Sequence, residues 1–188
     1  NDSACAYLKD FGAATASNGA VGLYHIENLT PEAVELGEKL IAEGAREYVI
    51  DDAELERVKN NYPVIWKNPD ATPKLCFVGC PHLSLEQLKT WTVDIENELK
   101  KNGKKKVTIN TVFTASPGVL EAFNKTEYAM RLKATGVITS YICPLMYMNN
   151  PLCKKMPVIT SSNKLRTYTS SRYYTDAEIL TAITGGKN

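Results

Sequence analysis

The sequence alternates short runs of Val, Ile, Tyr and other apolar residues with longer segments whose apolar residues recur at helical spacing. The runs that we expect to form strands are residues 21–25, 47–50, 75–79, 106–113, 137–142 and 157–160. Residues 75–79 (LCFVG) are continuously apolar, which is typical of a strand buried on both faces. Strands separated by helices pair in parallel through crossover connections. The pattern therefore predicts an α/β fold, a three-layer α/β/α arrangement with a mostly parallel sheet of about five strands.

Capping residues mark where the intervening helices begin. We expect helices after Thr30, Asp51, Ser84, Ser116 and Thr175. In three of them a side-chain amide or carboxylate stands three residues after the cap, which is the capping-box pattern: Glu54 after Asp51, Gln87 after Ser84, and Glu178 after Thr175. The helix after Ser116 is expected to be interrupted and to resume over residues 126–135. Glycine is favoured just past a helix end, so we place helix ends near Gly44, Gly103, Gly136 and Gly185.

Length and composition narrow the class of protein. The chain of 188 residues fits one domain, and we expect residues 1–188 to form a single α/β domain. Its 22 basic and 21 acidic residues give a net charge of +1, which disfavours nucleic acid as a partner. No segment reaches the ~20 apolar residues of a membrane helix, and the N-terminus lacks a signal-peptide pattern. We therefore expect a cytoplasmic protein with no membrane partner.

The chain has five cysteines, which are Cys5, Cys76, Cys80, Cys143 and Cys153. An odd number in a chain of ordinary size fits reduced thiols or metal ligands better than a disulfide framework. Cys76 stands in the middle of a predicted strand, where a cysteine usually acts as a small buried hydrophobe. Cys80 and Cys143 instead follow predicted strands, and each is followed by a proline that stiffens the turn. These two are our candidate metal ligands.

Ligands of open parallel sheets bind beyond the carboxyl ends of the strands. Besides the two cysteines, this rule selects His25, His82 and the run Thr160-Ser161-Ser162-Asn163-Lys164. His82 is a candidate acid/base residue, although a structural hydrogen bond beside the Ser84 cap explains it equally well. Hydroxyls, an amide and an ammonium in one turn are suited to a carboxylate or phosphate. The sequence lacks the glycine-rich nucleotide motifs and the GxSxG and HExxH motifs.

Three stretches together resemble a known family. They are LKDFGAATASNGAVGLYHIENLTPEA (8–33), FVGCPHLSLEQL (77–88) and MPVITSSNKLRTY (156–168). In this order they are similar to the later part of the catalytic chain of the aconitase X family. Members of that family are dehydratases that act on small anionic hydroxy acids, among them phosphomevalonate and cis-3-hydroxy-L-proline.

The resemblance implies an iron–sulfur cluster held by three cysteines, with an open iron that polarises the hydroxyl of the substrate. By position, Cys80 matches the cysteine of the GCPH motif, and Cys143 is the expected second ligand. The third ligand would come from a segment preceding residue 1. Ser161, Ser162 and Lys164 are the corresponding candidates for binding the anionic group of the substrate.

The resemblance also implies missing partners. The earlier half of the catalytic chain has no counterpart here, nor does the small swivelling domain or subunit that supplies a serine thought to act as base. We therefore expect a fragment of a larger catalytic chain that alone turns over little or no substrate. Two alternatives remain open: a non-catalytic interaction domain with buried structural cysteines, and a zinc site formed by Cys80, His82 and Cys143.

Overall fold

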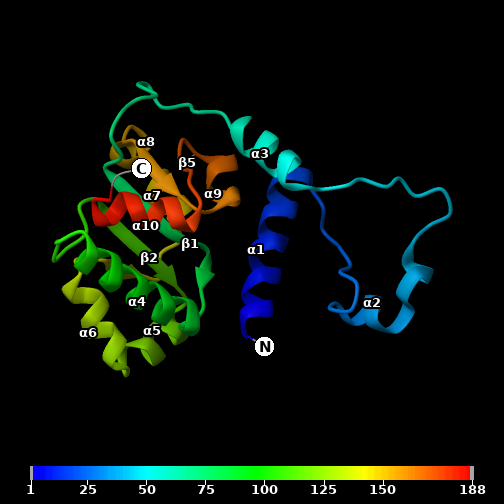
Figure 1. Cartoon of the computed structure of the whole chain (residues 1–188), viewed down its shortest axis with the longest axis horizontal. Helices are drawn as coiled ribbons and strands as arrows, with labels where there is room; N and C mark the ends of the chain where they lie inside the picture. The colour runs from blue at the N-terminus through cyan, green and yellow to red at the C-terminus, as the bar shows by residue number, and fades with distance from the viewer. Residues whose placement is uncertain (1, 187–188) are drawn as a thin grey trace.

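The computed structural model, in which residues 2–186 are described, is built on a five-stranded sheet (Figure 1). The strands are β1 (Leu75–Leu83), β2 (Asn110–Ala115), β3 (Ile138–Ser140), β4 (Val158–Thr160) and β5 (Arg172–Tyr173). They run in the order β3-β2-β1-β4-β5, and every pair is parallel. The predicted α/β fold with a parallel sheet of about five strands is confirmed.

In the described chain, some helices pack against the sheet and others precede its first strand in the sequence. They are α1 (Asp2–Gly19), α2 (Pro31–Leu36), the 3₁₀ turn η1 (Gly37–Leu40), α3 (Asp52–Asn60), α4 (Leu85–Lys101), α5 (Pro117–Asn124), α6 (Glu127–Ala134), α7 (Pro144–Met148), α8 (Pro151–Lys154), α9 (Asn163–Tyr168) and α10 (Asp176–Thr184). The capping boxes predicted for α4 and α10 are both present. Among these described helices, none has the length and apolar character needed to cross a membrane.

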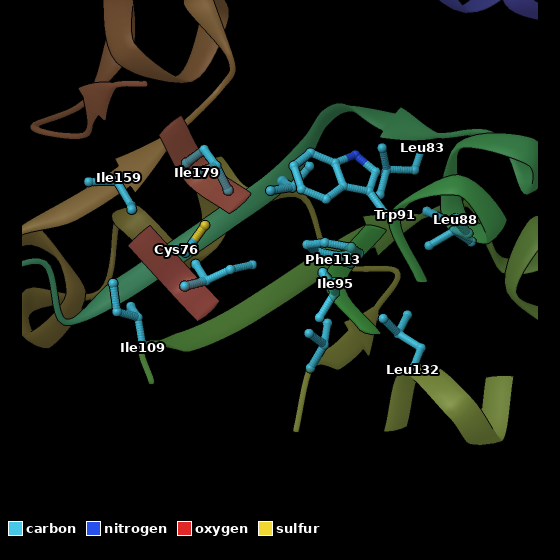
Figure 2. Packing of buried hydrophobic residues seen from close by; sticks show 14 of the residues in the cluster. Cys76, Leu83, Leu88, Trp91, Ile95, Ile109, Phe113, Leu132, Ile159 and Ile179 are labelled. Atoms are coloured by element: carbon cyan, nitrogen blue, oxygen red, sulfur yellow. The ribbon is translucent and has the colours of Figure 1, made fainter. Parts of the chain in front are cut away.

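Alternate residues of β1 point to opposite faces of the sheet, as the pleat of a strand requires. Cys76 and Val78 belong to the larger apolar core with residues of α4, α5, α6 and α10, as the close view in Figure 2 shows for Cys76. Leu75 and Phe77 belong to a second cluster with Val158 and with residues of α7 and α9. The sheet is therefore the middle layer between two layers of helices.

The strand order reverses between β1 and β4. From β1 the chain moves outward to β2 and β3, then returns to the other side of β1 to form β4 and β5. Leu75 pairs with Asn110 on one side and with Val158 on the other, so β1 is the centre of the sheet. In open α/β sheets the crevice at such a reversal is where ligands bind. The carboxyl ends of β1 and β4 are therefore the place to look for a site.

Two predicted strands, residues 21–25 and 47–50, are wrong. Both segments have no regular secondary structure, and their apolar side chains, among them Leu23 and Val49, are exposed. Within residues 2–186 neither segment has a neighbouring strand to pair with, and an apolar run without a partner cannot form a ladder. The predicted strand 106–113 also starts later, at Asn110, because the Val107 amide donates to the Thr135 carbonyl outside the sheet.

Some helical predictions also need correction. The helix that follows Thr30 ends at Leu36 and not near Gly44, and the Thr30 hydroxyl accepts from the Ile26 amide rather than capping the helix. Asp51 does cap α3, since its carboxylate accepts from the Glu54 amide at 2.8 Å. The predicted capping box is not complete, because the Glu54 carboxylate accepts from Tyr48 and Arg57 instead of the Asp51 amide. Helices α1, α7, α8 and α9 and strand β5 were not among the predicted elements; apart from α1, they are short or irregular, with a weak periodic signal.

Residues 20–60, which follow α1 along the chain, form an extended arm on the side of α1 that faces away from the sheet (Figure 1). The loop that carries α2 projects away from the sheet, and the chain returns through α3 before it enters β1. In this arm only Thr30 and Ala33 are classed as buried. Residues 73–186, which we call the sheet unit, contain almost all of the buried core.

Candidate functional site

A cavity of about 370 Å³ lies at the reversal point of the sheet. Its walls come from α1, from the end of β1, from the turn between β4 and α9, and from the start of α10. The polar side chains in its lining include Asp10, Cys80, Ser161, Lys164, Tyr173 and Asp176. Cys80 and Pro81, which belong to β1 and not to a turn after it, thus meet the predicted Ser-Ser-Asn-Lys turn at one cavity.

Gly79 brings the end of β1 close to β2. Its φ is +108°, and a Cβ at this position would lie 2.3 Å from the Thr114 carbonyl oxygen. The Thr114 hydroxyl donates to the Gly79 carbonyl at 2.5 Å. Because only glycine fits this backbone and this approach, the sequence Gly-Cys-Pro directs the residues after Gly79 into the cavity.

Cys80 is buried at the cavity and belongs to the smaller apolar cluster. Burial raises the pKa of its thiol, and the nearby Cys143 raises it further, while the Ser162 hydroxyl and the Lys164 ammonium lower it. A buried cysteine of this kind is a protonated thiol at neutral pH unless a metal ion binds it as a thiolate.

Cys143 precedes α7 and is partly buried. The nearby Cys143 raises the pKa of the Cys80 thiol, and the role of the two cysteines as metal ligands stays a prediction. Cys76 is fully buried, as predicted, and is the second residue of β1. Among the described residues, no three His, Cys, Asp or Glu side chains come together to hold a metal ion. The zinc set of Cys80, His82 and Cys143 is therefore not assembled there.

The turn after β4 contributes one buried and two accessible candidates. The Ser162 hydroxyl donates to the Cys80 carbonyl and accepts from the Leu165 amide at 2.9 Å. Ser162 thus joins the turn to the end of β1 and caps α9. Ser161 and Lys164 line the cavity, and neither side chain has a hydrogen-bond or ion-pair partner elsewhere in residues 4–186. These two polar groups are available to a ligand.

His82 lies near the end of β1, but its side chain is outside the lining of the cavity. Its carbonyl accepts a hydrogen bond from the Lys9 ammonium. Burial lowers the pKa of the imidazole, and the charge of Lys9 lowers it further. The neutral imidazole is therefore favoured, and the backbone of His82 helps to fix α1 on the sheet.

Helix α1 adds a wall to the cavity that we did not predict. Lys9 fixes one part of it at His82, and near its end Asn18 accepts hydrogen bonds from Arg166 at 2.7 Å and from Thr167 at 2.6 Å. Between these anchors, Asp10 lines the cavity. The capping pattern at Thr175 places Asp176 at the first position of α10 and so could have suggested it, whereas no local signal identified Asp10.

Models of one protein family match this chain over two segments. The model described as "Aconitase X second domain" matches residues 1–60, and "Aconitase X third domain" matches residues 73–182. The chain belongs to the aconitase X family. The resemblance found in the three sequence stretches is thus confirmed, and the matched third domain is the sheet unit with the cavity at its edge.

Named relatives agree with this membership. The phosphomevalonate dehydratase large subunit of Thermococcus kodakarensis is 32% identical over 113 residues, which are 60% of this chain and 26% of that protein. The large subunit of the enzyme of the same name from Methanocaldococcus jannaschii is 29% identical over 170 residues, 87% of this chain and 38% of that protein. This aconitase X chain therefore spans well under half the length of these curated relatives.

A solved structure has the same fold. The holo form of Thermococcus kodakaraensis aconitase X superposes with a TM-score of 0.68 at 24% sequence identity. The match covers 94% of this chain and 43% of that one. At this identity the likeness establishes the shared fold, and the chemistry has to be argued from the cavity itself.

Proposed function

We propose that this chain is part of the large subunit of an iron–sulfur hydro-lyase that removes water from a small anionic hydroxy acid. The observation that carries the proposal is the cavity at the sheet reversal, where Cys80, Ser161 and Lys164 meet. The names of the relatives make phosphomevalonate the first substrate to test. cis-3-Hydroxy-L-proline is the second substrate, because the family resemblance includes both.

The cavity is chemically suited to the anionic end of such a substrate. Lys164 offers an ammonium without an ion-pair partner in the described chain, and Ser161 adjoins it with a free hydroxyl. A hydrogen bond between an ionised donor and a carboxylate or phosphate contributes about 1.5–3 kcal/mol. Ser162 supports this turn from beneath, because its hydroxyl bonds the Cys80 carbonyl and the Leu165 amide.

The donor chemistry of the site fits part of an iron–sulfur cluster. Thiolates are the ligands that such clusters use, and Cys80 of β1 and Cys143 before α7 are the two cysteines that we propose as ligands. The third ligand in this proposal comes from a part of the protein outside this sequence. When bound, the cluster would supply a Lewis-acidic iron for the hydroxyl group that leaves.

The residues of this chain have three tasks in the proposed reaction. Cys80 and Cys143 hold the cluster, Ser161 and Lys164 bind and orient the anionic group, and Trp91 and Phe11 form apolar walls that limit water. Fixed donors beside a carboxylate also stabilise the negative charge that builds up as a neighbouring carbon loses its proton. His82 was our candidate for acid/base work, and its place beside the cavity leaves it a role in positioning α1 through its carbonyl.

The proposed activity needs partners. The relatives are named as large subunits, so we propose that a small subunit or domain completes the site and supplies the base. We further propose that this sequence is a fragment of a larger catalytic chain in the cytoplasm and that alone it turns over little or no substrate. Five free cysteines are in keeping with a reducing compartment.

The substrate-binding part of the proposal is tested with the full-length protein and its small subunit. Wild type should convert phosphomevalonate to an alkene, which NMR follows directly. Lys164→Met should raise KM by about 10- to 100-fold, as expected for loss of a charged hydrogen bond. Lys155→Met, an exposed lysine outside the cavity, is the matched control and should leave KM unchanged. Equal KM values in the two variants would contradict the assigned role of Lys164.

The cluster-binding part is tested by iron and sulfide content after anaerobic reconstitution of the full-length protein. Cys80→Ser and Cys143→Ser should each lose most of the iron and the visible absorbance. Cys153→Ser is the matched control, since Cys153 lies on α8 outside the cavity, and it should keep both. Full iron content in Cys80→Ser would exclude Cys80 as a ligand.

A further inference from the structure

We propose that Asp10 is a proton donor in this reaction and that its carboxyl group protonates the substrate hydroxyl that leaves as water. The inference rests on the proposed hydro-lyase function and assigns the acid that this function requires. It comes from the geometry of the cavity, where Asp10 is the carboxyl group that α1 contributes to the wall shared with Cys80 and Pro81 of β1 and with the Ser-Ser-Asn-Lys turn.

The position of Asp10 is set by its neighbours on α1 and beyond. Lys9, the preceding residue, donates to the His82 carbonyl, and its ammonium lies 3.3 Å from Gln87 Oε1. Gln87 is itself fixed, because its Oε1 accepts from the Ser84 amide at 2.9 Å in the capping box of α4. One helical turn of α1 is thus fastened to the end of β1 and the start of α4. The adjacent Asp10 is held at the mouth of the cavity, where it remains accessible to a ligand.

The other polar groups in the cavity wall are suited to roles other than that of the proton donor. Lys164 has a charge suited to binding an anion, Cys80 is a buried thiol, and Ser162 is used in two structural hydrogen bonds. The imidazole of His82 does not line the cavity. Among the described wall residues, this leaves the carboxyl groups of Asp10 and Asp176. Asp176 is the first residue of α10, and it also lines a second cavity together with residues of α4.

Partial burial at the cavity wall raises the pKa of Asp10. The cavity walls displace part of the surrounding water, which raises the pKa of the carboxyl group even though the cavity is open to solvent. The neighbouring Lys9 ammonium lowers that pKa, Asp176 raises it, and the Gln87 amide lowers it, with a net upward shift. The titratable and charged groups that line the same cavity are Tyr7 on α1, Cys80 on β1, Lys164 on α9, Tyr173 on β5 and Asp176 on α10.

The Asp10 carboxylic acid gives its proton to the substrate hydroxyl, the C–O bond breaks with its electron pair passing to that oxygen, and water leaves. A hydroxyl base of the small subunit, the serine that the family resemblance implies, takes the proton from the adjacent carbon, and the C–H electron pair forms the C=C bond. Asp10 is left as a carboxylate and regains a proton from solvent through the open mouth of the cavity.

The test compares Asp10→Asn, Asp10→Glu and Asp70→Asn in the full-length protein with its small subunit. Asp70 is an exposed turn residue far from the cavity lining, so Asp70→Asn is the matched control. We measure kcat and KM for phosphomevalonate across a range of pH, and substrate binding by calorimetry. Asp10→Asn should lower kcat by about 10²- to 10⁴-fold with little change in KM. The wild-type rate should fall as the pH rises through the pKa of Asp10, and Asp10→Glu should retain much of the rate with this basic limb displaced.

The outcomes distinguish this inference from the proposed function. Wild-type turnover with full kcat in Asp10→Asn, or an unchanged basic limb in Asp10→Glu, would overturn the role of Asp10 and leave the hydro-lyase proposal intact. Bound substrate with no wild-type turnover of phosphomevalonate or cis-3-hydroxy-L-proline would overturn both. A loss of calorimetric binding in Asp10→Asn equal to its loss of activity would make Asp10 a binding group and contradict its role as acid.

Discussion

The arm of residues 20–60 and the sheet unit of residues 73–186 have similarly apolar sequences but differ in how those residues are used. In the sheet unit, runs such as LCFVG become buried strands because neighbouring strands and helices cover both faces. In the arm, runs such as VGLYH and EYVI stay without regular structure, with their apolar side chains exposed. An apolar run therefore favours burial, but it becomes a strand only where a neighbouring strand is available to pair with it.

Truncation of a large apolar side chain should show the largest difference in stability between the two regions. Phe113 on β2 has 0% exposure and packs edge to face with Trp91, whereas Ile50 in the arm has 67% exposure. Phe113→Ala should lower the free energy of unfolding by about 3–5 kcal/mol because it leaves a cavity in the core. Ile50→Ala should change it by less than about 0.5 kcal/mol. Urea denaturation of the two variants measures the difference, and similar losses in both would break the comparison.

The backbone at Gly79, which shapes the cavity, should be almost as sensitive to substitution. Gly79→Ala places a methyl group 2.3 Å from the Thr114 carbonyl oxygen at a φ of +108°, so about 3 kcal/mol of stability should be lost. Gly118→Ala is the matched control, because nothing lies within 4 Å of a Cβ there. The control should be neutral or stabilising by up to about 1 kcal/mol, since alanine is the better helix former. A Gly79→Ala protein of wild-type stability would contradict the described approach of β1 to β2.

Helix α1 lies between the two regions and should respond locally. Asn18→Ala removes the acceptor for Arg166 and Thr167, two exposed hydrogen bonds that together contribute about 1 kcal/mol to the docking of α1 on α9. Hydrogen exchange should become faster in residues 8–19 and stay unchanged in β1 and β2. Asn60→Ala, at the end of α3, is the control. Unchanged exchange in α1 would mean that other contacts hold it.

The smallest expected effect is a dependence of stability on pH. Burial lowers the pKa of His82 in the folded chain, so the unfolded chain binds more protons as the pH falls through the ordinary histidine value of about 6.5. The stability contributed by the neutral imidazole is therefore present above this value and lost below it, by less than about 1 kcal/mol. His82→Gln should flatten this part of the stability profile between pH 7 and 5. A profile identical to wild type would contradict a lowered pKa.

The sequence predicted the sheet unit better than the arm, for a physical reason. The capping boxes at Ser84 and Thr175 and the apolar run in β1 are local signals. The structure confirms the two helices and the strand that they predicted. The rule that ligands bind at strand ends also selected Cys80 and Lys164, and both line one cavity in the structure. Asp10 was not predicted because its position depends on the neighbouring Lys9. The Lys9 ammonium contacts His82 and Gln87, which are more than 70 positions away in the sequence. No local pattern records such contacts.

The central claim is that the reversal point of the sheet unit binds the substrate. A crystal structure of the full-length protein with its small subunit and bound phosphomevalonate tests this claim most directly. The account predicts an anionic group of the ligand at Lys164 and Ser161, with Asp10 facing the hydroxyl and Cys80 bound to iron. An ordered ligand elsewhere in the complex, with the cavity between α1 and the end of β1 filled by water, would contradict it.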